Sequence, residues 1–538
     1  MERCEFSSRE DAGGVAAPHA PADASVDPTD ARKIEVLSRS HMIPVDAVWV
    51  YAVPQATTSR ARSLSWVTAG GGTVDAAAQV AAQVSTNTAK LASRIGDEVT
   101  RGKSWWKLRR TWRMSEPRDT GVPDRYFAPV PDEITARDLP VAGTLPPALN
   151  GLYLRNGPNP RPGSPLPFIA GDGMIHGVRL EAGQARWYRN RYVKTRRDAG
   201  RRGGASSNTH VFAHAGHILS FVEVALPVEI DRELETIGPF DFGGIDTAFT
   251  AHGKIDPVTG ELLAFGYQFA DPHLTFYRID RAGRIAERRA IGVSHACLMH
   301  DFATTENHVL FFDTPTVMVQ DWGRGGLPFQ WHEGRPTRLG IVPRNGGAER
   351  WFDVAACQVT HTANAFERDD RIVVDGIRIN RFPPNMAADP PVLYRWEIDL
   401  ARGLVAESPL DEHAAEFPRI DDRRNGRPYR YAYTVEYGEI GPGDLPRTAV
   451  LRRYDLDTGN SIANDFGDRY MPGEPVFIPK SAESAEDDGW VLAFRYDRER
   501  DRSDLVVLDA NDFGGDPIGV VQLPGRVPCG NHGSWVAD

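Results

Sequence analysis

From Val122 onward, short apolar runs rich in β-branched and aromatic residues alternate with turn sequences. Clear examples of the runs lie at residues 216–223, 308–312, 371–375 and 504–508. Turn sequences containing Asp and Gly lie at residues 256–260, 280–283 and 457–460. Runs of this length and composition predict strands, and the turns predict hairpins. With no helical pattern of comparable length between them, they predict one large all-β domain, and its size favours a β-propeller.

Residues 1–121 have a different pattern and are expected to form an N-terminal extension, largely helical or disordered. Residues 1 to about 60 are rich in Ala, Pro, Asp and Ser with weak periodicity, which predicts disorder. Apolar residues at helical spacing predict an amphipathic helix over about 74–101. The basic segment 103–113 interleaves Trp with Lys and Arg. It would suit either a membrane surface or a helix that packs on the main domain.

Composition narrows the class of protein. The chain has 538 residues, of which 41% are hydrophobic and 25% are charged, with a net charge of -11. This balance favours a soluble globular protein and disfavours nucleic acid as a partner. Four cysteines lie far apart, at Cys4, Cys297, Cys357 and Cys529, which favours a reduced compartment. Without a recognisable signal sequence or spanning segment, we expect a cytoplasmic protein, with peripheral membrane contact as an option.

Candidate chemistry centres on four of the fifteen histidines, His252, His300, His361 and His532. They lie in the motifs AHG, MHDF, THTANAFE and NHG. Four neutral imidazoles would leave a bound divalent metal with its full charge and room for further ligands. The histidines are 48, 61 and 171 residues apart. The first two intervals fit one blade of roughly 50 to 60 residues each. The last is three times 57, which would mean that blades without a histidine are skipped before His532. On innermost strands, all four side chains would then point toward the propeller axis.

A ligating imidazole usually donates its remote N–H to an acceptor that fixes the ring orientation. Three glutamates in strand-like or proline-flanked settings are candidates for this role: Glu223, Glu416 and Glu474. Each of them alone would be an ordinary surface charge. Their coincidence with the four histidines makes them candidate partners of a metal site.

These motifs resemble the carotenoid cleavage oxygenases, a family that includes stilbene-cleaving dioxygenases and a retinoid isomerase. The matching segments keep the family's order and span about three quarters of the chain. They are residues 126–130, 150–160 and 171–177, the motifs around His300 and His361, residues 416–421, and His532 with Gly533. The resemblance implies a seven-bladed propeller with one non-haem Fe(2+) per subunit. It implies His252, His300, His361 and His532 as ligands, with Glu223, Glu416 and Glu474 behind them.

The implied reaction is oxidative cleavage of a carbon–carbon double bond by O2, which gives two carbonyl products. The protein would hold the iron, exclude water and position a small hydrophobic polyene, so no side chain is assigned as an acid, base or nucleophile. Stilbene-cleaving members typically carry a lysine just before the first glutamate, where this chain has Val222. Since that lysine would stabilise a phenolate, its absence favours a carotenoid or apocarotenoid.

Two alternatives stay open. A stilbene or lignostilbene substrate is one, since Tyr188 and Tyr192 are nearby in the segment 187–192. A propeller that serves as a binding scaffold without catalysis is the other, and stoichiometric iron would separate it from an enzyme. A propeller hydrolase or lactonase is disfavoured, because such sites hold Ca²⁺ through carboxylates and amides rather than imidazoles. Isomerisation of a retinoid ester is possible in principle, but the sequence gives no positive sign of it.

Overall fold

A computed structural model provides the structure of the chain. It describes residues 44–45, 48–49, 125–162, 164, 168–195, 206–319, 328–440 and 446–538. The chain divides into two units, residues 1–107 and 108–538. In the first unit, β1 (Pro44–Val45) and β2 (Val48–Trp49) form an antiparallel pair. The helix expected over 74–101 and the basic segment 103–113 lie outside the described residues. The disorder expected up to about residue 60 and the boundary after residue 121 stay predictions.

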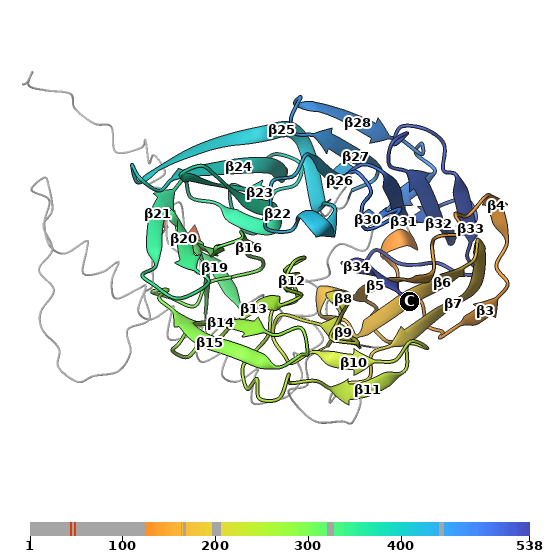
Figure 1. The fold of residues 1–538 in the computed structure, drawn as a ribbon, viewed down its shortest axis with the longest axis horizontal. Coiled ribbons are helices and arrows are strands. Elements are labelled where there is room, and N and C mark those ends of the chain that lie inside the picture. The colour runs from red at the N-terminus through yellow and green to blue at the C-terminus, as the bar shows by residue number, and fades with distance from the viewer. Residues whose placement is uncertain are drawn as a thin grey trace, which may run out of the picture. The chain divides into compact units, whose positions relative to one another are not determined.

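The second unit is built from antiparallel sheets that surround a central axis, as Figure 1 shows. Strands β8, β12, β22 and β34 lie toward the axis, whereas β11, β15 and β28 lie at the rim. Helical structure in the described part of this unit is limited to three short 3-10 turns. They are η1 (Arg125–Phe127), η2 (Phe168–Ala170) and η3 (Asp422–Arg424). The expected all-β propeller is confirmed for this unit.

Three of the sheets have four strands in sequence order, with the first strand innermost. The first contains β8 (His210–His214), β9 (His217–Phe221), β10 (Val228–Ile230) and β11 (Thr236–Pro239). The second contains β12 (Lys254–Ile255), β13 (Leu262–Tyr267), β14 (Leu274–Ile279) and β15 (Ile285–Ile291). The third contains β16 (Ala303–Thr304), β17 (His308–Asp313), β20 (Thr337–Pro343) and β21 (Arg350–Val354). The loop after β17 carries a separate hairpin of β18 (Thr316–Met318) and β19 (Phe329–Trp331).

A seven-stranded ladder follows. Its strands are β22 (Gln358–Arg368), β23 (Arg371–Ile379), β24 (Val392–Asp399), β25 (Leu404–Arg419), β26 (Tyr431–Tyr437), β27 (Ala449–Asp455) and β28 (Asn460–Asn464). The long strand β25 pairs with β24 up to Ala414 and with β26 from Ala415 onward. Seven blades require this ladder to be divided at β25, and that blade count stays a prediction.

Two further sheets close the ring by joining strands from both ends of the unit. One contains β29 (Tyr470–Pro472), β30 (Val476–Pro479), β31 (Gly489–Asp497), β32 (Arg502–Asp509), β33 (Gly519–Gln522) and β4 (Val141–Gly143). The other contains β3 (Thr135–Arg137), β5 (Gly151–Pro158), β6 (Gly173–Glu181), β7 (Gln184–Tyr192) and β34 (Gly533–Ala537). Within them, β4 pairs with β33 and β5 pairs with β34.

Burial explains why the sequence pattern predicts these strands so well. Middle strands such as β13 and β31 are buried along their whole length, because neighbouring sheets cover both of their faces. The outer strand β15 alternates half-buried and exposed residues instead. The runs expected at 216–223, 308–312, 371–375 and 504–508 correspond to β9, β17, β23 and β32. The expected turns lie between β12 and β13, β14 and β15, and β27 and β28.

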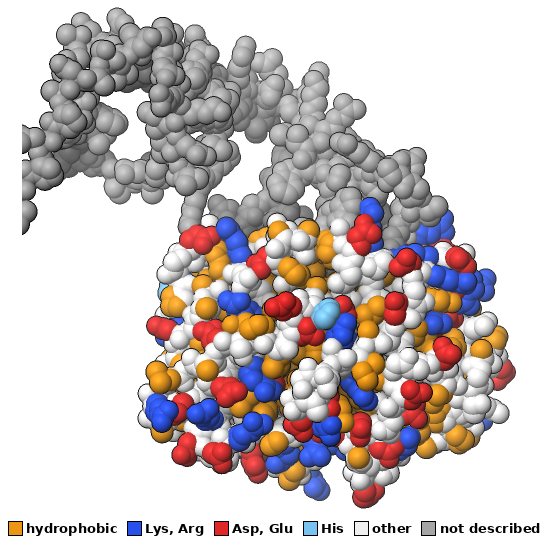
Figure 2. Space-filling model, turned by 90° about the horizontal axis from the view of Figure 1, so that it is seen from above, with side chains coloured by type: hydrophobic (Ala, Val, Ile, Leu, Met, Phe, Trp, Pro, Cys, Tyr) orange, Lys and Arg blue, Asp and Glu red, His pale blue; other side chains and the backbone are white. Residues whose placement is uncertain are grey.

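The outer surface of the propeller unit is mixed. Figure 2 shows Lys, Arg, Asp and Glu side chains of both signs interspersed with hydrophobic ones over the face in view. In the part of the chain that the structure describes, there is no helix of the length and hydrophobicity needed to cross a membrane.

Candidate metal centre

The four predicted histidines all lie where an innermost strand begins. His252 precedes β12 by two residues, His300 precedes β16 by three, and His532 immediately precedes β34. His361 lies within β22. Because these strands all face the axis, residues at their starts converge there even though they are far apart in the sequence. The expectation of histidines on inner strands is therefore accurate to within three residues.

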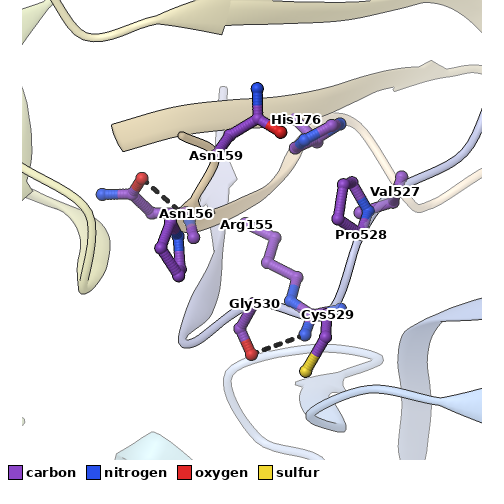
Figure 3. A pocket seen from close by; sticks show the side chains of 10 residues that line it. Arg155, Asn156, Asn159, His176, Val527, Pro528, Cys529 and Gly530 are labelled. Atoms are coloured by element: carbon purple, nitrogen blue, oxygen red, sulfur yellow. Dashed lines mark hydrogen bonds between the residues drawn. The ribbon is translucent and has the colours of Figure 1, made fainter. Parts of the chain in front are cut away.

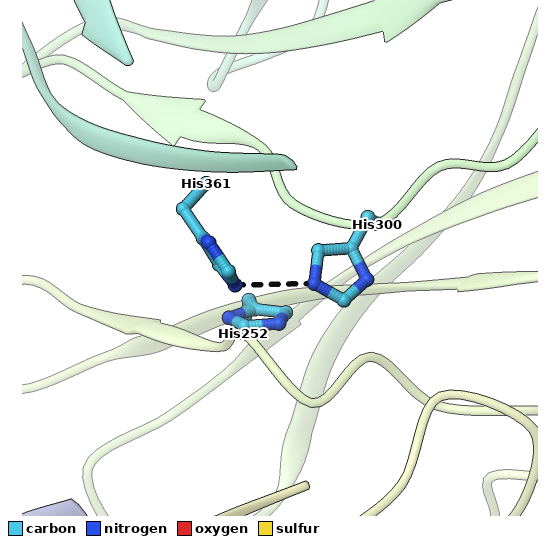
Figure 4. A group of neighbouring side chains, drawn as sticks. All are labelled: His252, His300 and His361. Atoms are coloured by element: carbon cyan, nitrogen blue, oxygen red, sulfur yellow. Dashed lines mark hydrogen bonds between the residues drawn. The ribbon is translucent and has the colours of Figure 1, made fainter. Parts of the chain in front are cut away.

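Their rings form one cluster. One ring nitrogen from each of His252, His300 and His361 lies within 4.8 Å of the other two. Figure 4 shows the three rings pointing toward one another. The Nε2 atoms of His300 and His361 are 3.2 Å apart. His532 borders this group, with its ring centroid 4.7 Å from those of His252 and His361. Three of the four predicted ligands could thus hold a metal ion together, and the fourth lies beside them.

Each of the three predicted glutamates contacts a different histidine through that ring's Nδ1. Glu223 pairs with His300. Glu416 accepts a hydrogen bond from His361 at 2.6 Å, and Glu474 accepts one from His532 at 2.8 Å. Since a carboxylate can only accept, each Nδ1 carries the proton, and each Nε2 is left with a lone pair. The structure therefore brings together every histidine and glutamate that the sequence singled out.

The glutamates are themselves held in place. Tyr267 donates its hydroxyl to Glu223 at 2.8 Å, and Thr360 donates to Glu416 at 2.7 Å. Glu474 is 2% exposed and receives the backbone N–H of Gly533 at 2.7 Å. The Arg419 guanidinium lies 3.3 Å from the same carboxylate. Rings and carboxylates thus form a rigid set.

Burial and charge decide the protonation of this set. Burial lowers the pKa of His252 well below its usual value, and the neighbouring histidines lower it further. Burial also lowers the pKa of His532. Burial raises the pKa of Glu416 and Glu474, but their partners together, led by His361 in the first case and Arg419 in the second, lower it below the usual value. Burial lowers the pKa of His300 as well, but the neighbouring carboxylates, led by Glu223, raise it above the usual value. The neutral rings of His252 and His532 leave their nitrogen lone pairs free to bind a metal.

Three observations fit a divalent cation. The His252 Nε2 atom is buried without a hydrogen-bond partner. When both rings are neutral and their Nδ1 protons are directed at glutamates, the Nε2 atoms of His300 and His361 face each other as two acceptors at 3.2 Å. That spacing is close to the roughly 3 Å expected for two imidazoles on one ion with bonds of about 2.1 Å. Finally, Glu223, Glu416 and Glu474 with Arg419 leave two negative charges that a divalent ion would neutralise.

The sequence analysis did not identify two neighbours of this cluster. The His210 ring centroid lies 5.2 Å from that of His532, and its Nδ1 bonds to the Ala251 carbonyl at 2.9 Å. Phe417 stacks on His361 at 5.5 Å and meets His532 edge-on at 5.3 Å. Its φ of 54° is left-handed, a geometry that costs about 1–3 kcal/mol in a residue with a side chain. Position next to Glu416 could have drawn attention to Phe417, whereas nothing in the sequence marks His210.

A cavity of about 420 Å³ opens beside the histidines. His252, His361 and His532 lie in its wall. Charged and polar side chains make up much of the remaining wall, including Lys254, Asp301, Arg419, Asp422, Arg423 and Asn425. Apolar groups contribute too, among them Phe212, Ile255, Pro418 and Ile420. The histidines are thus reachable through a cavity whose wall combines apolar and charged side chains.

A separate contact fixes the loop that carries His532. Arg155, only 3% exposed, donates to the carbonyl oxygens of Gly530 at 2.8 Å and Asn531 at 3.3 Å, next to a small cavity of about 10 Å³. Figure 3 shows the arginine directed at Gly530. Gly157 crosses this loop so closely that an added Cβ would lie 2.7 Å from the Gly530 Cα. The segment 155–157 therefore packs against residues 530–531 and holds the loop that carries His532 in place.

Comparison with known proteins supports the resemblance to the carotenoid cleavage oxygenases. The family model described as retinal pigment epithelial membrane protein matches residues 127–537. A carotenoid cleavage oxygenase of Mycobacterium tuberculosis is 36% identical over 483 residues, which cover 76% of this chain and 96% of the relative. A carotenoid 9,10(9',10')-cleavage dioxygenase 1 of Phaseolus vulgaris is 31% identical over 78% of this chain and 91% of its own length.

Among solved structures, the lignostilbene dioxygenase of Pseudomonas brassicacearum superposes with a TM-score of 0.71 at 32% identity. The match covers 78% of this chain and 100% of the other. Sequence motifs, propeller and histidine cluster agree with these likenesses. The chain therefore belongs to the retinal pigment epithelial membrane protein family, that of the carotenoid cleavage oxygenases, and is an oxidoreductase that uses O2.

Proposed function

We propose that this enzyme holds one Fe(2+) through His252, His300, His361 and His532 and cleaves a double bond of a carotenoid or apocarotenoid to two carbonyl products. The observation that carries the proposal is the convergence of the ring nitrogens of His252, His300 and His361 beside buried carboxylates, with the Nε2 of His252 buried without a partner. An all-nitrogen set suits iron and leaves the ion its charge. Bound iron(II) would supply the activation of O2 next to the alkene.

The protein's own residues have positioning roles in this reaction. Glu223, Glu416 and Glu474 hold the protons on the Nδ1 atoms, so that each Nε2 faces the ion. Phe417 lies across His361 and His532, which keeps water from that side of the rings. In this family the reaction takes place between O2 and the alkene. The rate of cleavage therefore depends on which double bond the protein positions next to the metal site.

Two observations favour a polyene over a stilbene. Position 222 is a valine, which cannot stabilise a phenolate next to Glu223. Tyr188 is fully buried, and its hydroxyl is 2.9 Å from His176 Nδ1. Tyr192 receives a hydrogen bond from Asn159 at 2.7 Å. Both tyrosines thus have structural partners of their own. The likeness to a lignostilbene dioxygenase keeps a stilbene as the second candidate.

A substrate panel tests the proposal. Fe(2+)-loaded protein is incubated with full-length carotenoids, apocarotenals and hydroxystilbenes, and the carbonyl products are identified by mass spectrometry. We expect aldehydes or ketones from a carotenoid or apocarotenoid, with no turnover by metal-free protein. Cleavage of hydroxystilbenes alone would establish the second candidate, and turnover without metal would refute the iron site.

We also propose that the protein is cytoplasmic and touches membranes through residues 103–113, because a polyene dissolves in lipid. Tryptophan and cations in one segment suit an anionic surface. Deleting residues 1–115 is expected to weaken sedimentation with anionic liposomes while the iron content stays unchanged. Deleting residues 1–60 is the control and should leave binding intact. Equal liposome binding by both deletions would contradict the proposed contact.

A further inference from the structure

We propose that Asp301 is a positioning residue that sets the spacing of His252, His300 and His361 by tying their three chain segments together. The proposal rests on the metal site described above and concerns residues outside it. Asp301 follows His300 directly, and its side chain is 2% exposed. A carboxylate buried this deeply needs several donors, and Asp301 has them.

The first tie joins the segment of His300 to that of His361. Thr362, the residue after His361, donates its backbone N–H to Asp301 Oδ2 at 2.7 Å. Its hydroxyl lies 2.9 Å from the same oxygen and 2.8 Å from the Phe302 carbonyl. Residues adjacent to two predicted ligands are thus bonded directly to each other across two sheets.

The second tie joins the segment of His252. Lys254, two residues after His252, lies with its Nζ 2.9 Å from Asp301 Oδ1 and 3.1 Å from Oδ2. The backbone N–H of Phe302 donates to Oδ1 at 2.7 Å. One carboxylate therefore contacts residues within two positions of each of the three histidines whose nitrogens converge. His532 is held separately, by Glu474 and Arg155.

The chemistry of these contacts indicates positioning. A buried ion pair is a poor source of stability, because desolvation offsets much of the attraction. Its hydrogen bonds instead require specific distances and directions. Ligands on three separate chain segments can keep a short nitrogen–nitrogen spacing only if their backbones are fixed relative to one another, and Asp301 supplies that link.

Every partner of Asp301 is a donor, which makes Asp301→Asn a sharp probe. The asparagine amide has the same shape, but whichever way it is turned, its NH2 faces a donor that it cannot bond. We expect Asp301→Asn to weaken metal affinity by about 10–100-fold, the range found for groups that orient ligands. Lys254→Met, which removes only the ammonium, should show a smaller loss and serves if Asp301→Asn does not fold.

Asp497→Asn is the matched control. Asp497 is equally buried and bonds to Arg469 and Arg500, in the sheet that contains β31. The probe is Co²⁺ alone, titrated into metal-free full-length protein and followed by its visible absorption. Thermal unfolding of the metal-free proteins measures stability separately.

The expected result is weaker Co²⁺ binding with an altered absorption band in Asp301→Asn, and wild-type affinity in Asp497→Asn. Wild-type affinity and absorption in Asp301→Asn, with a fall in Tm like that of Asp497→Asn, would overturn the proposal and leave the metal site standing. Absence of Co²⁺ binding by the wild type, or binding that survives His361→Ala, would remove the metal site and the proposal with it.

Discussion

His361→Ala is expected to abolish stoichiometric metal binding and reduce turnover to background. His361 contributes one of the three converging ring nitrogens, lies within β22 and faces His300 across 3.2 Å. No neighbouring side chain on that strand can take its place, because the adjacent residues, Thr360 and Thr362, carry hydroxyls that contact Glu416 and Asp301. The loss of affinity should exceed the about 100-fold upper range for residues that only orient ligands.

Metal content after anaerobic reconstitution with Fe(2+) and dialysis measures the effect. His413→Ala is a suitable control, since His413 is 48% exposed and bonds to Asp411 at 2.6 Å. The control should retain one ion per chain. Retention of a full equivalent of iron by His361→Ala would show that the metal lies elsewhere.

Glu474→Ala is expected to lower the free energy of unfolding of the metal-free protein by about 3–5 kcal/mol, the range for removing one partner of a buried ion pair. The remaining ion is Arg419, whose side chain is 14% exposed and whose other carboxylate, Asp422 at 3.7 Å, is 78% exposed and a weak replacement. The variant also loses the acceptors of His532 Nδ1 and of the Gly533 N–H. In Glu474→Ala the Gly533 N–H is left without an acceptor. Glu474→Gln keeps one side-chain oxygen that can accept this hydrogen bond, so it should lower the free energy of unfolding by less.

Urea denaturation of metal-free protein gives these free energies, and Co²⁺ titration gives the accompanying loss of affinity. Glu235→Ala provides the matched control. Glu235 pairs with Arg191 and Lys194 but is 49% exposed, so its removal should cost no more than about 1 kcal/mol. Equal costs for the two variants would mean that the buried carboxylate has no special part in holding the His532 loop.

Much of this architecture could be predicted from the sequence because its causes are local. Strands such as β17 and β23 are covered on both faces, so their apolar runs are continuous. Hairpin turns need Gly, Asp or Asn at particular positions, as in residues 457–460 between β27 and β28. The four histidines and three glutamates could be found because each lies in a short recognisable motif.

The remaining features depend on distances that no local pattern encodes. Asp301 meets Thr362 and Lys254 from 61 and 47 residues away, so those contacts exist only once three sheets are in register. The left-handed backbone of Phe417 is likewise set by its surroundings, since proteins normally place glycine or asparagine in that conformation. His210 begins β8, and the closed arrangement of the propeller brings it near His532. It has no sequence motif of its own.

Strand β34 both completes the sheet of β5 and places His532 one residue before its start. The histidine cluster can therefore be completed only after β34 has been synthesised, because His532 and the closing strand arrive together. Until β34 has left the ribosome and paired with β5, a growing polypeptide has three of these histidines and an unsealed ring. Binding of a metal by all four histidines can only follow synthesis of β34. A bound ion would then link this strand to the other inner strands and would resist reopening of the propeller.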